Sequence, residues 1–245
     1  MQDGICEYLT WDSSFFALAI GRVMGHRLTP ERTEAVRNWG NAHDIDCLYF
    51  LADPGDGATL IEVSQHGFFL TDIRVQFEID LRQHQSRLSS VPLVRPFQPE
   101  DLQSLRALAR ISHRDSRFYF DPGFPTERCD ELYATWIERS TEGWADAVFV
   151  AEQSGHPVGY ISCHLDGETG SIGLVAVDPN AHRQGLGLAL VRRALSFFED
   201  RGMRRTIVIT QGRNLGSQRL YQRSGFVTES VRLWYHYWPE KRDKA

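Results

Sequence analysis

A strand-like run, two closely spaced glycines and a helical pattern follow one another in the C-terminal half of the chain. Residues 171–177 are typical of a β-strand that stops at Asp178-Pro179, and Gly185 and Gly187 then precede a run with helical spacing. Glycines let the backbone approach a ligand closely, and the free N–H groups and positive dipole of a helix start favour a polyanion. This order of elements predicts a pyrophosphate site.

A second motif lies downstream of this helix. Asn214 precedes Tyr221, and Gly225-Phe226 follow after a further short stretch. A phenol with an ordinary pKa near ~10 is protonated at neutral pH and can donate a proton to a leaving thiolate. A lone tyrosine on an amphipathic helix equally packs its ring on the core, and asparagine is a common helix N-cap. The residues alone therefore indicate either an acid beside a thioester or an ordinary capped helix.

Together the two segments resemble the GNAT family, the acetyl-CoA-dependent N-acetyltransferases. The strand, the Asp-Pro and the Gly-Leu-Gly turn are similar to that family's CoA pyrophosphate motif, and residues 214–226 are similar to its second motif. The resemblance implies that acetyl-CoA is the acetyl donor and that Tyr221 is the catalytic acid. His182 departs from the family, which usually has Gln or Arg there. The implied contacts with acetyl-CoA are Leu174, Val175, Ala176, Val177, His182, Arg183, Gln184, Gly185, Leu186, Gly187, Leu188, Asn214, Ser217 and Tyr221.

The resemblance also implies an α/β (α+β) GNAT fold, with a mixed, mostly antiparallel central sheet flanked by helices. Residues 149–152, 158–164 and 172–177 read as an antiparallel meander, because turn residues separate them. We expect helices from Leu102, from Leu186 to Gly202 and from 214 to 224, a buried strand at 206–210, and a closing strand at 231–238.

Polar residues and prolines between 83 and 99 predict a domain boundary near Ser90. Residues 1–90 would form a smaller N-terminal domain and residues 91–245 the catalytic domain. In the first part, 65–68 and the strand after them weakly repeat 223–226 and the strand that follows. This indicates either a reduced GNAT-like half or a generic helix end. Since it has no glycine turn after a strand, we expect it to shape a pocket and not to bind CoA.

Further segments, 9–16, 116–122 and 132–137, resemble the TDP-fucosamine acetyltransferases. That resemblance implies an acceptor such as dTDP-4-amino-4,6-dideoxygalactose, a nucleotide-linked amino sugar. Arg117 could then bind the diphosphate through its planar fork, and Tyr119 could offer a ring face. The alternative is a loop whose aromatic residues seal the sheet. Two other functions stay open: acetylation of another amine, such as an aminoglycoside, polyamine or peptide N-terminus, and non-catalytic CoA sensing. No general base is identified.

Composition limits the remaining classes. The 245 residues carry a net charge of -5, which argues against a general binder of nucleic acid or membrane surfaces. The widely spaced Cys6, Cys47, Cys129 and Cys163 indicate reduced thiols and predict neither disulfides nor a metal site. The first residues do not resemble a signal peptide and no apolar run is long enough to span a bilayer, so we expect a cytoplasmic protein. The aromatic residues 234–238 pack either on the first domain or on a second copy, which leaves a homodimer open.

Overall fold

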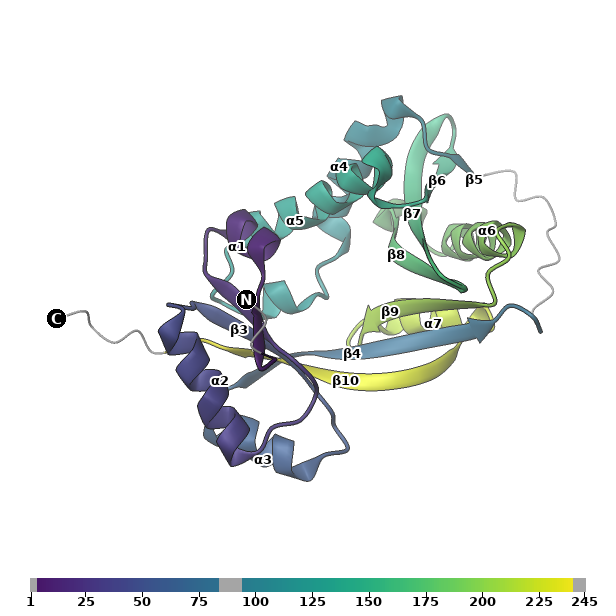
Figure 1. Ribbon diagram of the computed structural model, residues 1–245. Helices are drawn as coiled ribbons and strands as arrows, with labels where there is room; N and C mark the ends of the chain where they lie inside the picture. Colours follow the sequence, from purple (N-terminus) through teal and green to yellow (C-terminus); the bar gives the residue numbers. More distant parts are fainter. Residues whose placement is uncertain (1–3, 84–93, 240–245) are drawn as a thin grey trace. The chain divides into compact units, whose positions relative to one another are not determined.

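The computed structural model describes residues 4–83 and 94–239, and the chain divides into two compact units built from non-consecutive segments (Figure 1). The first unit comprises Met1–Arg74, Ser116–Phe124 and Val231–Ala245, and the second comprises Val75–Asp115 and Pro125–Ser230. The expected boundary near Ser90 lies outside the described residues.

The observed division therefore differs from two consecutive domains. Strands β4 (Phe69–Asp80) and β10 (Val227–Tyr237) are long, and each contributes residues to both units. The change between units at Arg74 and Val75 falls inside β4. As a result, the 116–124 segment, which we expected in the catalytic domain, belongs to the first unit.

The sheet of the second unit has the strand order β10-β4-β9-β8-β7-β6-β5. Its further strands are β5 (Val94–Pro96), β6 (Ala147–Gln153), β7 (His156–Asp166), β8 (Thr169–Val177) and β9 (Arg205–Gln211). Strands β5 to β8 pair antiparallel, and β8 pairs parallel with β9. The predicted meander and the mixed, mostly antiparallel sheet are confirmed.

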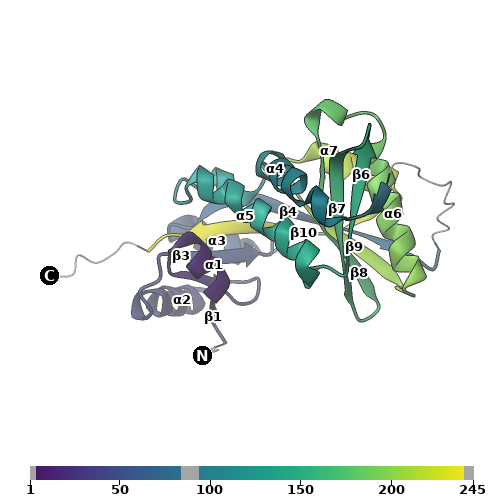
Figure 2. The ribbon, with the colours of Figure 1, turned by 90° about the horizontal axis from the view of Figure 1, so that it is seen from above.

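Helices cover both faces of this sheet. Helices α4 (Leu102–Ser112) and α5 (Thr126–Arg139) lie on one side of β6, β7 and β8, and α6 (Leu186–Asp200) lies on the other (Figures 1 and 2). Helix α6 buries Leu190, Ala194 and Phe198 completely, as its helical apolar spacing requires. Helix α7 (Leu215–Arg223) follows β9. Short helical turns complete the unit: η1 (Pro99–Asp101), η3 (Ser140–Trp144) and η4 (Pro179–Ala181).

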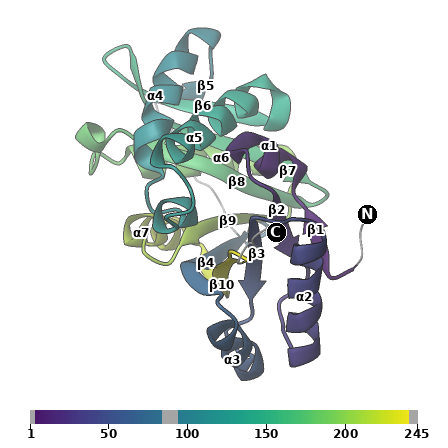
Figure 3. The ribbon, with the colours of Figure 1, turned by 90° about the vertical axis from the view of Figure 1, so that its left-hand side faces the viewer.

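The first unit has the strand order β1-β2-β3-β10-β4, with β1 (Cys6–Tyr8), β2 (Ile20–Val23) and β3 (Cys47–Ala52). Strand β3 pairs parallel with β2 and antiparallel with β10. Helices α2 (Pro30–Ala42) and α3 (Gly57–Gln65) lie on one face, and α1 (Thr10–Phe16) lies on the other (Figures 1 and 3). Because side chains alternate along a strand, Leu48 and Phe50 face one helix layer and Tyr49 faces the opposite side, where it contacts Phe118 of η2 (Arg117–Phe120).

The weak internal repeat has a local structural counterpart. Helix α3 is followed by Gly67 at φ 76° and strand β4, and α7 is followed by Gly225 at φ 92° and strand β10. Only glycine adopts this left-handed backbone at no steric cost, which explains the shared Gly-Phe. Among the described residues, none of the helices combines the length and apolar character that crossing a bilayer requires.

Candidate active site

Strands β8 and β9 separate halfway along their length. Their parallel pairing runs from Thr169 opposite Arg205 to Ile172 opposite Val208, and within the described chain it goes no further. Beyond Ile172, β8 therefore has a free edge on the side of β9. The opening lies at the C-terminal ends of both strands, as the GNAT resemblance implies.

Two hydrogen bonds show which amides point into this opening. The N–H of Asp178 donates to a carbonyl of β7 at 2.8 Å, and the N–H of Leu174 donates to Ser162 Oγ of β7 at 2.8 Å. Since successive N–H groups of a strand point to opposite sides, Val175 and Val177 direct theirs toward the opening. These two amides are available to pair with an extended ligand.

The other two predicted strand contacts use their backbone differently. Leu174 and Ala176 direct their N–H groups to β7, so only their side chains remain to border a ligand. Ser162 was not anticipated from the sequence. It lies where the register of β7 on β8 shifts between Ile161 and Cys163, so that its hydroxyl replaces the carbonyl that an unbroken ladder would offer Leu174.

The start of α6 is an open group of backbone amides. Gly185 is the N-cap at φ 82° and gives no side-chain cap, and Arg183 is also left-handed at φ 63°. The first hydrogen bond of the helix joins Ala189 N–H to Gly185 O at 3.0 Å. In the described residues, no backbone partner is found for the N–H groups of 183–188. Unpartnered amides at a helix start are what a pyrophosphate binds, so the geometry supports the predicted site.

Gly185 and Gly187 are constrained in different ways. A Cβ on Gly185 would meet no atom within 4 Å, so its positive φ alone demands glycine. A Cβ on Gly187 would lie 3.2 Å from Leu220 Cδ2, at the end of a flexible side chain of α7. Helix α7 therefore packs directly beside the amide group.

The side chains around the turn mainly hold it in place. His182 Nε2–H donates to Val177 O at 2.9 Å, which ties the turn back to the end of β8. Gln184 Oε1 accepts from Gln153 Nε2 at 3.0 Å, while Arg183 is exposed. His182 thus has a structural role here, and a direct contact of its side chain with CoA stays a prediction.

Asn214 caps α7. Its Oδ1 accepts the N–H of Ser217 at 3.0 Å, so the N-cap interpretation is confirmed. A contact of Asn214 or Ser217 with the CoA arm stays a prediction.

Tyr221 is both a core residue and a protonated phenol. It is 2% exposed, and its ring centroid lies 5.9 Å from those of Phe77 and Phe226. Burial raises the pKa of the phenol well above its ordinary value, and a hydrogen bond with Ser217 offsets part of that rise. Tyr221 therefore carries its proton at neutral pH, as a general acid must.

Arg117 lies among aromatic rings in the first unit. Its guanidinium carbon is 4.6 Å from the ring centroid of Tyr49 and 4.4 Å from those of Phe118 and Trp234. The buried Nε has no hydrogen-bond partner in the part of the chain that the structure describes. Phe118 is 2% exposed, whereas Tyr119 is half-buried. The segment thus seals the core through Phe118 and still retains an unmatched donor on Arg117.

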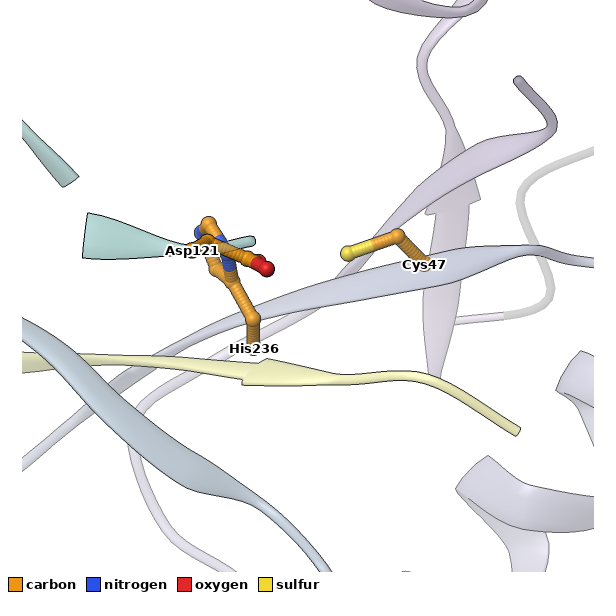
Figure 4. Close-up of side chains that lie close together, drawn as sticks. All are labelled: Cys47, Asp121 and His236. Carbon is orange, nitrogen blue, oxygen red and sulfur yellow. The ribbon is translucent and has the colours of Figure 1, made fainter. Parts of the chain in front are cut away.

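The same unit brings together Cys47, Asp121 and His236, whose possible ligand atoms all lie within 4.8 Å of one another (Figure 4). The sequence did not reveal this cluster, because 115 positions separate Asp121 and His236. All three side chains are buried. A cysteine, a carboxylate and an imidazole are side chains that can ligate a transition metal.

The hydrogen bonds favour a structural role. The carboxylate of Asp121 accepts from His236 Nδ1 at 2.5 Å, Trp238 Nε1 at 3.0 Å and the Gly123 N–H at 2.9 Å. Burial raises the pKa of the Cys47 thiol well above its ordinary value and lowers that of His236 to about 4. With Asp121 occupied, two donors remain, which is fewer than a structural zinc requires. We interpret the cluster as the attachment of the 116–124 segment to β10.

This attachment also accounts for the aromatic C-terminal strand. Trp238 donates to Asp121, Tyr237 stacks on Phe68 at 4.8 Å, and Trp234 contacts Arg117, all within the first unit. These aromatic residues therefore pack within the first unit, on Phe68 and on the 116–124 segment.

Comparisons with known proteins agree with this geometry. Residues 106–226 match the profile of the acetyltransferase (GNAT) family. The chain is 29% identical over 149 residues to the spore coat polysaccharide biosynthesis protein SpsD of Bacillus subtilis, covering 61% of this chain and 52% of the relative. It is 30% identical over 173 residues to the mycothiol acetyltransferase of Cellulomonas flavigena, covering 64% and 47%. The chain thus spans about half the length of these curated relatives.

Among solved structures, a GCN5-related N-acetyltransferase from Sphaerobacter thermophilus has a TM-score of 0.69 at 18% identity. The match covers 96% of this chain and 76% of that one, and it shows a shared fold. The family profile thus assigns residues 106–226 to the acetyltransferase (GNAT) family, and the structural match shows that the fold is shared.

Proposed function

We propose that the chain transfers an acetyl group from acetyl-CoA to the amino group of a nucleotide-linked amino-deoxy sugar. The use of acetyl-CoA as the donor is supported by the group of unpartnered amides at 183–188, which directly follows a strand with a free edge. This arrangement offers one place for a pyrophosphate and an adjoining edge for an extended amide chain.

The residues of the second unit divide the chemistry among them. The amides of 183–188 hold the pyrophosphate, and the N–H groups of Val175 and Val177 pair with the pantetheine arm and orient the thioester. Asn214 fixes the start of α7 and so positions Tyr221. Tyr221 donates its proton to the thiolate sulfur as the bond between carbon and sulfur breaks.

Two observations support a nucleotide sugar as the acceptor. One relative is named for polysaccharide biosynthesis, and the first unit holds Arg117 with a buried, unpartnered Nε. A buried guanidinium N–H without an acceptor is stabilised by a hydrogen bond to an anion, such as a diphosphate. Together with Tyr119 of the same helical turn, Arg117 would bind the nucleotide part of dTDP-4-amino-4,6-dideoxygalactose.

A second candidate acceptor is another small amine. It is favoured by the relatives named mycothiol acetyltransferase, one of which is 40% identical over 70 residues. Such an acceptor would give Arg117 no diphosphate to bind, which makes the two candidates separable.

The test is an acceptor screen with acetyl-CoA, followed by one variant. dTDP-4-amino-4,6-dideoxygalactose, the free amino sugar, an aminoglycoside, a polyamine and a peptide with a free N-terminus are compared by mass spectrometry for gain of one acetyl group. Arg117→Ala should then raise KM for the nucleotide sugar and leave KM for the free amino sugar and acetyl-CoA unchanged. If both sugars suffered equally, Arg117 would be holding its loop, and the nucleotide assignment would be wrong.

A further inference from the structure

We infer that His113 is the general base of the acetyl transfer, oriented by Tyr160 and Tyr133. The inference rests on the proposed transfer from acetyl-CoA and supplies the one role that the sequence left unassigned. Strand β8 (Thr169–Val177) contains no carboxylate to act as a base.

The orientation of His113 differs from that of comparable histidines. In the described chain, α2, α3 and α4 each have histidine as C-cap, at His43, His66 and His113. His43 and His66 turn Nδ1 back to the carbonyl four residues earlier, each at 2.9 Å. His113 instead places Nε2 at 2.9 Å from the hydroxyl of Tyr160. Its ring is therefore directed to the sheet and not to its own helix.

Tyr160 holds this ring on the face of the sheet to which Ala176 of β8 projects. Tyr160 is fully buried on β7, and its Cα lies opposite that of Ala176 on β8. Directly opposite residues of an antiparallel pair project to the same face. Ala176 stands between the two amides that point into the opening, those of Val175 and Val177. His113 thus lies on the α4 side of the strand segment assigned to the thioester.

A second contact joins the same region to the helix that bears the acid. Arg213 Nη1 donates to Asp115 O at 3.1 Å. This bond connects the segment just after His113 to the residue just before Asn214, the N-cap of α7. Because β8 and β9 run parallel, this loop and the opening lie at the same edge of the sheet. The segment that follows His113 and the segment that precedes α7 therefore meet at one end of the split strands.

The chemical state of the ring fits a base. His113 is half-buried and stacks on Tyr133 with ring centroids 4.4 Å apart. Burial lowers the pKa of His113 to about 4, so the imidazole is neutral at pH 7. The tautomer that donates Nε2–H to Tyr160 leaves the lone pair of Nδ1 free to accept a proton.

In the proposed transfer, His113 accepts one proton and Tyr221 donates one. The amine nitrogen forms a bond to the acetyl carbon, and its proton passes to Nδ1 of His113. The bond between the acetyl carbon and sulfur breaks, and the sulfur receives the proton of Tyr221. Solvent then returns a proton to Tyr221 and takes one from His113. The imidazole is neutral at rest, so the lone pair of Nδ1 can accept the proton of the cationic nitrogen formed by attack.

The experiment compares His113→Ala and His113→Gln with His43→Ala, which removes a C-cap histidine that also stacks on an aromatic ring, Trp39, at 4.3 Å. The acceptor is the amine that the screen identifies, and imidazole is added as an external base. Glutamine can still donate to Tyr160 but cannot act as a base. We expect both His113 variants to lose kcat by about 10²-fold with little change in KM for acetyl-CoA, and imidazole to restore part of the Ala variant's turnover. His43→Ala should keep wild-type kcat.

Wild-type turnover in folded His113→Gln, or a loss in His113→Ala that imidazole does not reduce, would overturn the base assignment and leave the acetyltransferase function standing. If the wild-type protein acetylated none of the amines, the proposed function itself would be wrong, and the base role would fall with it.

Discussion

Gly187 provides the sharpest test of the pyrophosphate site, because alanine and aspartate there add the same Cβ and only aspartate adds a carboxylate. Both alanine and aspartate place a Cβ 3.2 Å from Leu220 Cδ2, which a flexible side chain can accommodate. Gly187→Ala also replaces glycine inside a helix, which favours folding by up to about 1 kcal/mol. Gly187→Asp adds a carboxylate within the first turn of α6, next to the amides of 183–188.

The size of the effect follows from Coulomb's law. A carboxylate about 5 Å from a phosphate charge, at an effective dielectric constant of about 20–40 for this partly exposed turn, costs about 2–3 kcal/mol. Since about 1.4 kcal/mol corresponds to a tenfold change, Gly187→Asp should weaken acetyl-CoA binding by about 30- to 100-fold relative to Gly187→Ala. The penalty should shrink at high salt, because the turn is open to screening ions.

Isothermal titration calorimetry with acetyl-CoA, at low and high salt, measures both effects, and urea unfolding of each variant confirms that it is folded. Wild-type affinity for acetyl-CoA in folded Gly187→Asp would refute the placement of the pyrophosphate. An equal loss in both variants would show that packing against Leu220, and not charge, sets the affinity.

Three further outcomes are expected. Tyr221→Phe should lower kcat by about 10²–10⁴-fold with little change in CoA affinity, since the ring still packs; unchanged turnover with chemistry rate-limiting would remove Tyr221 from the mechanism. Asp121→Asn should lower the free energy of unfolding by about 1–3 kcal/mol in urea titrations, whereas Asp80→Asn, which breaks an exposed pair with Arg82, should change it far less. His113 and His236 have a pKa of about 4 in the folded state, whereas the pKa of an ordinary histidine is about 6.5. When the pH falls below about 6.5, these two imidazoles therefore bind protons in the unfolded chain but not in the folded chain. Stability should therefore be lost between about pH 6.5 and 4, by up to about 3 kcal/mol per imidazole, and a flat profile there would contradict their burial as neutral rings.

The sequence predicted those features that depend on local chemistry. The glycine turn before α6 and the Asn214 cap were recognisable because a positive φ and an N-cap each demand particular residue types within a few positions. The meander of β6, β7 and β8 was recognisable because short turns separate alternating runs.

Features that depend on distant pairing were not predictable. The attachment of the 116–124 segment to the first unit depends on hydrogen bonds from His236 and Trp238 to Asp121. These residues are far apart in the sequence, and the sequence around Asp121 does not indicate its partners. The hydroxyl of Ser162 and the ring of His113 acquire their places only once the registers of β7 and β8 are known. For the same reason, the division of the chain at Arg74 within a single long strand had no compositional signal.

A crystal structure of the protein with acetyl-CoA would test the central claim most directly. The account predicts the pyrophosphate on the backbone N–H groups of 183–188, the pantetheine arm along Val175 and Val177, and the thioester sulfur within hydrogen-bond reach of the Tyr221 hydroxyl. Acetyl-CoA bound away from the start of α6, or with its sulfur remote from Tyr221, would contradict it.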